Sequence, residues 1–206
     1  VSVLIDDAYE AAQTFLLPNS TVVSVAATLA EPTFAYTGFC DAGSTLPGLS
    51  DWIEQLIAES TGKDEKGVLP IVTSSPKSEI FPVITFDEQG ELAVTGSLGE
   101  QFIFWEWVTV LLGVGLKIDP FNQPNVTEAK EQTASCLTEW GNQLPVLAPE
   151  CTDSGVEIFG DGQSLKDALA TFIEDVKDGG YIAIMAYLDR RDDSRLQSCV
   201  PFSLRS

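Results

Sequence analysis

The stretch from Gln101 to Lys117, QFIFWEWVTVLLGVGLK, decides the class of fold that we expect. Its apolar side chains lie almost all round a helical projection, which is typical of a helix buried inside a core rather than at a surface. The apolar run is interrupted by Glu106 and is too short to cross a bilayer. We therefore expect a buried helix in a soluble protein.

Shorter apolar runs on both sides of this helix alternate with helical patterns. Several of them are apolar at every position, as strands covered on both faces of a parallel sheet are. The expected strands are 21–29, 68–73, 80–86, 156–159 and 181–188, with 91–97 either a strand or an irregular connection. The expected helices are 1–17, 51–61, 101–117, 125–140 and 165–177. The expected loops are 31–49 and 143–155. This alternation predicts an α/β fold, a three-layer αβα domain with a mainly parallel sheet.

Local signals mark the ends of two of these helices. Ser50 is expected to cap the helix that follows it, and Gly62 suits a left-handed residue at the end of that helix. Asn125, with Glu128 three residues on, has the spacing of a capping box and opens the next polar helix. The apolar stripe of this second helix consists of Val126, Ala129, Thr133, Cys136, Leu137 and Trp140.

The charge balance excludes several classes of function. The chain has 31 acidic and 11 basic residues, a net charge of −20, and no histidine. Such a chain is repelled by nucleic acids and by anionic membrane surfaces, so we expect neither as a partner. Without histidine there is no Ser-His-Asp triad, Cys-His dyad or histidine zinc site, and we expect no metal and no other cofactor. Acid–base chemistry then falls to carboxylates, lysine, tyrosine or cysteine.

The cysteines bear on the cellular compartment. Four of them lie far apart with no C-x-x-C pair: Cys40, Cys136, Cys151 and Cys199. We interpret them as reduced thiols of a cytoplasmic protein, and the alternative is two disulfides in an exported one. Residues 1–17 lack the positively charged start of a signal peptide, which favours the cytoplasm.

One segment stands out as a candidate site. No basic residue precedes Lys63, so the segment 59–67, ESTGKDEKG, carries the first positive charges of the chain. It follows a helix whose polar face carries Gln55 and Glu59 four residues apart. Lys130 stands off the apolar stripe of its helix, near the helix N-terminus, where a cation is electrostatically unfavourable. The alternative is that all of these residues belong to ordinary solvated surfaces.

Two segments resemble glucose-6-phosphate isomerase. Residues 52–63, WIEQLIAESTGK, resemble the segment that carries the catalytic glutamate of that family. Residues 115–130, GLKIDPFNQPNVTEAK, resemble its C-terminal signature, in which a lysine follows a glutamine by seven positions. Residues 104–107, FWEW, and 180–188, GYIAIMAYL, are similar to the branch in which the isomerase is fused behind a transaldolase.

The resemblance implies a fold and a domain organisation. Enzymes of this family have two sugar-isomerase (SIS) domains, each flavodoxin-like, and the similarity covers only the second. We therefore expect residues 1–19 to form an N-terminal linking helix and residues 20–206 a single SIS domain, a fragment of a larger enzyme with two SIS domains. The first SIS domain, or a homodimer partner, would then supply the grip on the sugar phosphate.

The resemblance also implies roles for particular residues. Glu59 corresponds to the base that moves a proton between C2 and C1 of the sugar through a cis-enediol, and Gln55 and Lys63 are expected to bind substrate. Lys130 corresponds to a cation near the ring oxygen and O1. Gln101 falls near the place of a histidine that assists ring opening, but an amide cannot accept and return a proton at neutral pH.

The expected function is therefore the interconversion of glucose 6-phosphate and fructose 6-phosphate. Such an aldose–ketose isomerisation needs a carboxylate and hydrogen-bond donors, and it needs no metal or redox cofactor. Two alternatives stay open. The chain could be a non-catalytic SIS module that binds a sugar phosphate, or a scaffold for oligomerisation.

Overall fold

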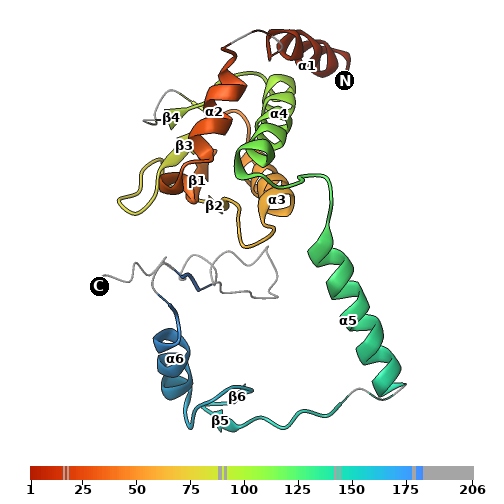
Figure 1. Ribbon diagram of the computed structural model, residues 1–206. Coiled ribbons are helices and arrows are strands. Elements are labelled where there is room, and N and C mark those ends of the chain that lie inside the picture. Colours follow the sequence, from red (N-terminus) through yellow and green to blue (C-terminus); the bar gives the residue numbers. More distant parts are fainter. Residues whose placement is uncertain are drawn as a thin grey trace. The chain divides into compact units, whose positions relative to one another are not determined.

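The structure, a computed structural model, describes residues 1–15, 17, 19–87, 90, 92–141, 143, 145–177 and 180–182 (Figure 1). The chain divides into two compact units, Val1–Glu139 and Trp140–Ser206. The predicted strand 181–188 lies outside the described residues from position 183 onward. The expected division into a linking helix 1–19 and an SIS domain 20–206 stays a prediction.

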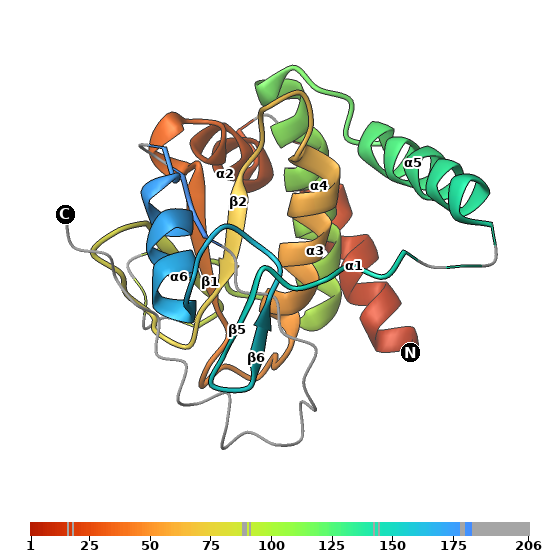
Figure 2. The ribbon, with the colours of Figure 1, turned by 90° about the horizontal axis from the view of Figure 1, so that it is seen from below.

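The first unit is built on a four-stranded sheet whose strands all run parallel. The strands lie in the order β2 (Leu69–Val72), β1 (Tyr36–Cys40), β3 (Val83–Thr85) and β4 (Leu92–Ala93). Helices flank this sheet, so the predicted α/β class is confirmed, and the arrangement is consistent with a three-layer αβα fold (Figures 1 and 2). Strands β2, β3 and β4 fall inside the expected runs 68–73, 80–86 and 91–97 but are shorter.

The core of this unit is formed by residues of the sheet and of helices α2 (Thr21–Leu29), α3 (Leu49–Thr61) and α4 (Leu98–Leu116), with α2 and α3 both packed against α4 (Figure 2). Trp105 of α4 is fully buried and meets the rings of Phe39, Phe86 and Phe104 edge-on, with centroids 5.4, 6.4 and 5.4 Å away. Edge-to-face contacts of this kind stabilise a core beyond the area they bury.

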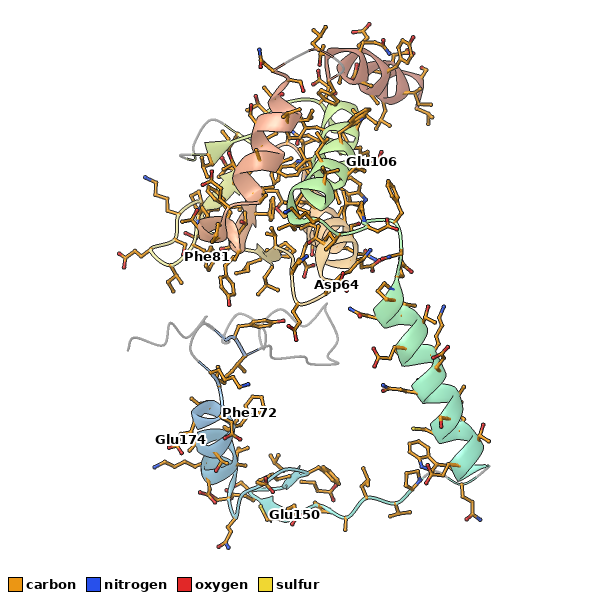
Figure 3. The ribbon with its side chains drawn as sticks, viewed as in Figure 1. Asp64, Phe81, Glu106, Glu150, Phe172 and Glu174 are labelled. Carbon is orange, nitrogen blue, oxygen red and sulfur yellow. The ribbon has the colours of Figure 1, made fainter. Side chains whose placement is uncertain are left out.

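Helix α4 confirms the predicted buried helix and begins earlier than expected. Ser97 caps it, because its hydroxyl accepts a hydrogen bond from the Glu100 N–H while the Glu100 carboxylate accepts one from the Ser97 N–H. The reciprocal pair is a capping box. Glu106, which interrupts the apolar run, is exposed on α4 (Figure 3).

Helix α1 (Ser2–Phe15) confirms the expected N-terminal helix, and it packs against α4. The two helices cross closely, because a Cβ at Gly99 of α4 would overlap the carbonyl oxygen of Leu4. Phe15 adds an edge-to-face contact with Phe104 at 5.8 Å. The absence of a side chain at Gly99 therefore sets how α1 meets the core.

The prediction of a strand at 21–29 is wrong, because these residues form helix α2. Its β-branched residues favour a strand locally. The buried side chains, however, are Val22, Ala26 and Leu29, spaced as on one face of a helix, whereas Val23 is half exposed. Packing against α4 decides the outcome over local preference.

The expected loop 31–49 is also wrong, because it contains a short 3₁₀ helix, η1 (Pro32–Phe34), and the central strand β1. The glycine of the sequence YTGFC obscures this strand, since glycine weakens a strand pattern. In the structure Gly38 has a specific use: a Cβ there would lie 2.9 Å from the Phe81 ring. Phe81 therefore packs on the β1 backbone at a place that only glycine leaves open (Figure 3).

The predicted end of α3 at Thr61 is confirmed, but its predicted start and the predicted cap conformations are wrong. The helix begins at Leu49 with Gly48 as its N-cap, and Ser50 is buried inside its first turn. The carboxylate of Asp41 caps the helix instead, accepting from the N–H groups of Gly48 (2.8 Å) and Ser50 (3.0 Å). Gly62 does follow the helix, but its φ of −71° is not left-handed.

Helix α5 (Pro124–Trp140) departs from the expected pattern in two ways. It begins at Pro124, so Asn125 lies inside the first turn and is not the N-cap. Proline suits a first helical position because the missing N–H has no partner within the helix there. The apolar stripe is not buried: Val126, Leu137 and Trp140 are 41%, 54% and 39% exposed.

The second unit contains a small hairpin and a helix. Strands β5 (Cys151–Asp153) and β6 (Val156–Ile158) pair antiparallel, so the expected loop 143–155 is wrong at its end, while the expected strand 156–159 is confirmed. Ser154 and Gly155 have positive φ, 53° and 83°, as a two-residue type I′ turn requires. Helix α6 (Leu165–Glu174), capped by the Ser164 hydroxyl, confirms the expected helix but ends three residues before the predicted Lys177.

Two further expectations concern cysteines and membranes. Cys40, Cys136 and Cys151 carry free thiols, and Cys199 lies outside the described residues. Within the described ranges, no helix is both apolar and long enough to cross a bilayer.

Candidate functional site

The candidate site forms where two segments far apart in the sequence meet. The end of α3 and the residues just after it lie against the turn between α4 and α5. The Lys63 ammonium donates hydrogen bonds to the backbone carbonyls of Asp119 (2.8 Å) and Asn122, 56 and 59 positions later. The Asn125 amide donates to the Gly62 carbonyl at 3.2 Å. The two segments that carry the resemblance are thus in direct contact.

Two cavities include Glu59 in their lining. One has a volume of about 300 Å³ and is lined by Ala58, Glu59, Gly62, Lys63, Gln123, Pro124, Asn125 and Val126. The other has about 280 Å³ and is lined by Trp52, Gln55, Leu56, Glu59, Ser60, Pro120 and Gln123. Glu59 and Gln123 line both cavities. Each volume lies near the lower limit of small-molecule sites, so a small ligand suits them better than a large one.

Glu59 and Gln55 form the polar pair of this site. Both are exposed, and they lie one helical turn apart on α3. The Gln55 amide donates to a carboxylate oxygen of Glu59 at 3.0 Å. Ile53 and Ile57, on the opposite face of α3, are fully buried and anchor the helix in the core. A carboxylate on a fixed helix, oriented by an amide, is a suitable group for relaying a proton.

Lys63 has a different setting from the other predicted site residues. It is only 5% exposed, and two of the three donors of its ammonium go to backbone carbonyls. It lines the first cavity, so the expected substrate-binding role stays a prediction.

Gln101 and Lys130 line neither of the two cavities. Gln101 is 1% exposed; its amide donates to the Val94 carbonyl at 2.8 Å and accepts from the Trp105 indole at 3.0 Å. It lines a separate cavity of about 540 Å³ bordered by α1, α2 and α4. Lys130 is exposed on α5. The structure therefore brings Gln55, Glu59 and Lys63 together and leaves these two residues apart from them.

Gln123 and Asn125 join the site although they were not among the predicted site residues. The sequence does contain a signal for them, because both residues lie in the segment 115–130, which resembles the C-terminal signature of the isomerase family. The sequence predicts Asn125 as a helix cap, whereas in the structure its side-chain amide donates to the Gly62 carbonyl.

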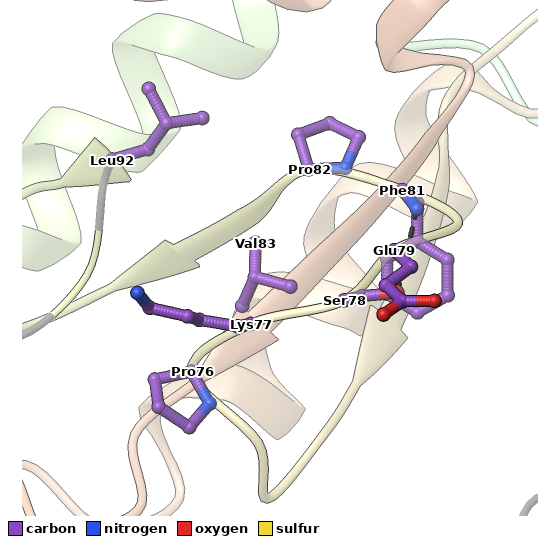
Figure 4. A pocket seen from close by; sticks show the side chains of 8 residues that line it. All are labelled: Pro76, Lys77, Ser78, Glu79, Phe81, Pro82, Val83 and Leu92. Carbon is purple, nitrogen blue, oxygen red and sulfur yellow. Dashed lines mark hydrogen bonds between the residues drawn. The ribbon is translucent and has the colours of Figure 1, made fainter.

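A further cavity, of about 470 Å³, lies elsewhere in the first unit (Figure 4). All of its lining residues except Leu92 come from the segment 76–83, and they include Lys77, Ser78 and Glu79. No predicted site residue lines it. Among the described residues, no group of cysteine, aspartate and glutamate side chains could hold a metal ion.

No protein-family model matches the chain, and a search of the curated proteins gives no match either.

Proposed function

We propose that this chain is the second sugar-isomerase domain of a glucose-6-phosphate isomerase, with Glu59 as the catalytic base. The observation that carries the proposal is the meeting of the two resembling segments around Glu59, through the bonds of Lys63 and Asn125. Neither contact enters into the resemblance, which rests on sequence alone. If the resemblance were accidental, there would be no reason to expect residues of 52–63 and 115–130 to line the same cavities, as they do.

The proposed reaction uses one carboxylate for two proton transfers. Glu59 takes the proton from C2 of open-chain glucose 6-phosphate, and the electron pair forms the C1–C2 double bond of a cis-enediol. The hydroxyl proton of O2 passes to O1, and Glu59 returns its proton to C1, which gives fructose 6-phosphate. The amides of Gln55, Gln123 and Asn125 are among the hydrogen-bond donors that line the two cavities and are available to the sugar oxygens.

The phosphate group of the substrate is negatively charged, and the chain, with a net charge of −20, repels it electrostatically. The proposal therefore includes a first SIS domain or a homodimer partner that grips the phosphate. It also includes a cytoplasmic location, where sugar phosphates of this kind occur.

A second candidate is a non-catalytic SIS module that binds a sugar phosphate. It is favoured by the setting of Gln101, whose amide is buried and bonded within the core. This residue gives the chain no proton donor for ring opening at that position.

The test separates proton transfer from ring opening. The chain is incubated with fructose 6-phosphate in heavy water, and NMR follows deuterium entering C1. Glu59→Gln should lower the exchange rate by about 10²- to 10⁴-fold, because the general base is lost. Glu54→Gln, which removes another exposed carboxylate of α3 that lines neither cavity, should leave the rate unchanged.

Binding of fructose 6-phosphate without exchange, in a folded chain, would favour the binding module. Equal exchange in the parent chain and in Glu59→Gln would contradict the enzyme proposal. A folded chain that neither binds nor exchanges would mean that this chain lacks the grip on the phosphate, and it would contradict both candidates as functions of the chain by itself.

A further inference from the structure

We propose that Lys63 is a positioning residue, whose buried ammonium holds the turn 117–122 and thereby places Gln123 beside Glu59. This inference rests on the proposed function for its meaning in catalysis. Its structural part, the holding of the turn, stands on the contacts alone. It assigns Lys63 a role different from the substrate-binding role that the sequence suggested.

The ammonium binds the turn at two points. Its partners are the backbone carbonyls of Asp119 and Asn122, which lie at the two ends of the tight bend before Gln123. Both bonds are charge-assisted, and such bonds are roughly twice as strong as neutral ones. Because backbone carbonyls are the partners, the lysine acts on the path of the main chain rather than on one side chain.

Other contacts of the turn leave its position beside α3 dependent on this lysine. Its far side rests on α4, where a Cβ at Gly113 would lie 2.9 Å from the Pro120 ring. Its own bend is closed by the Asp119 carboxylate, which accepts from the Phe121 N–H at 2.9 Å. Toward α3, the Asn125 amide, just beyond the turn, donates a further hydrogen bond to the Gly62 carbonyl at 3.2 Å.

The position of the turn decides what faces Glu59. Gln123 follows Asn122 directly and lines both cavities, as Glu59 does. Pro120 lines the second cavity beside Gln55 and Glu59. A shift of the turn away from α3 would therefore withdraw Gln123 and Pro120 from the catalytic carboxylate while leaving α3 itself in place.

The test compares Lys63→Met with Lys66→Met by hydrogen exchange of backbone amides. Methionine is nearly as long as lysine and carries no donor, and Lys66 is an exposed lysine of the same loop, so both variants lose one positive charge. Lys63→Met should speed exchange in residues 117–126 by roughly tenfold to a hundredfold, because charge-assisted bonds are lost. Amides of α4 should be unaffected, and Lys66→Met should behave as the parent chain.

Unchanged exchange in residues 117–126 would overturn the inference, and so would an equal rise in α4, which would make Lys63 a support of the whole unit. If Lys63→Met does not fold, Lys63→Gln, polar but one atom shorter, takes its place in the same comparison.

A second measurement follows the rate at which deuterium enters fructose 6-phosphate, divided by the amount of folded protein. It should fall about tenfold in Lys63→Met and stay unchanged in Lys66→Met, because a displaced Gln123 no longer faces Glu59. An equal fall in both variants would mean that the lysine acts by its charge on the substrate and would overturn the positioning role. A parent chain without exchange would contradict the proposed function, while the amide exchange would still decide whether Lys63 holds the turn.

Discussion

At the scale of single residues, the loop that carries Lys63 is closed by Thr61 and Gly67. Thr61 is fully buried; its hydroxyl donates to the Ile57 carbonyl at 2.8 Å and accepts from the Val68 N–H at 3.3 Å. Gly67 has a φ of +124°, and a Cβ there would lie 2.7 Å from the Thr61 carbonyl oxygen. The chain can therefore turn back toward β2 only with glycine at this position.

We expect Gly67→Ala to destabilise the protein more than Gly43→Ala. Both glycines have positive φ, +124° and +84°, but a Cβ at Gly43 meets nothing within 4 Å. Gly43→Ala should cost about 1 kcal/mol for its backbone conformation alone. Gly67→Ala should cost about 2 kcal/mol more, since backbone must move. Urea unfolding measures both changes, and equal losses would contradict the close contact with Thr61.

At the scale of elements, two helices of similar amphipathic pattern have different surroundings. In α2 the face formed by Val22, Ala26 and Leu29 is buried against α4. In α5 no residue is buried, although the apolar residues are spaced as a helix requires. Periodicity indicates which face of a helix could be buried, and only a neighbouring element decides that it is.

We expect Gly99→Ala to loosen α1 from the rest of the first unit. The added methyl group would overlap the Leu4 carbonyl, so α1 must shift or detach. Alanine favours the helical conformation of α4 by about 1 kcal/mol, which offsets part of the loss. Limited proteolysis should therefore cleave residues 1–17 at least several-fold faster. Gly115→Ala in the same helix is the control, since its Cβ would meet only the Ala30 Cβ, at 3.0 Å; equal cleavage of the two variants would contradict the close crossing.

At the scale of the whole molecule, the buried cluster belongs to the first unit. Its fully enclosed members run from Val22 to Leu112, so residues 1–139 contain the main core. Glu59 belongs to this unit as well, and α3 leads from it into β2 through residues 62–68. The candidate site thus lies toward the amino-terminal end of β2, whereas open α/β sheets usually bind ligands at the carboxyl ends of their strands. The site is therefore a product of the loop contacts and not of the sheet topology.

We expect residues 1–139 to fold without the rest of the chain. Because every buried member of the core cluster among the described residues lies within them, thermal unfolding should stay cooperative, with a midpoint within about 5 °C of that of the full chain, a shift that corresponds to roughly 1 kcal/mol. Near-ultraviolet circular dichroism reports on Trp105 and its aromatic neighbours in both proteins. A broad transition or a lost aromatic signal would show that the second unit is needed for the core.

The sequence by itself determined the features that depend on residues close together in the chain. The all-round apolar pattern of 101–117 predicted α4, the alternation of runs predicted the α/β class, and a spacing of four placed Gln55 and Glu59 on one helical face. Tertiary structure alone decided that 21–29 is a helix, that YTGFC is the central strand, and that Lys63 is buried against a turn 56 positions away. The physical reason is that burial and strand pairing need partners that are distant in sequence. The free energy gained from these contacts exceeds the small differences in helix and strand propensity of the local sequence.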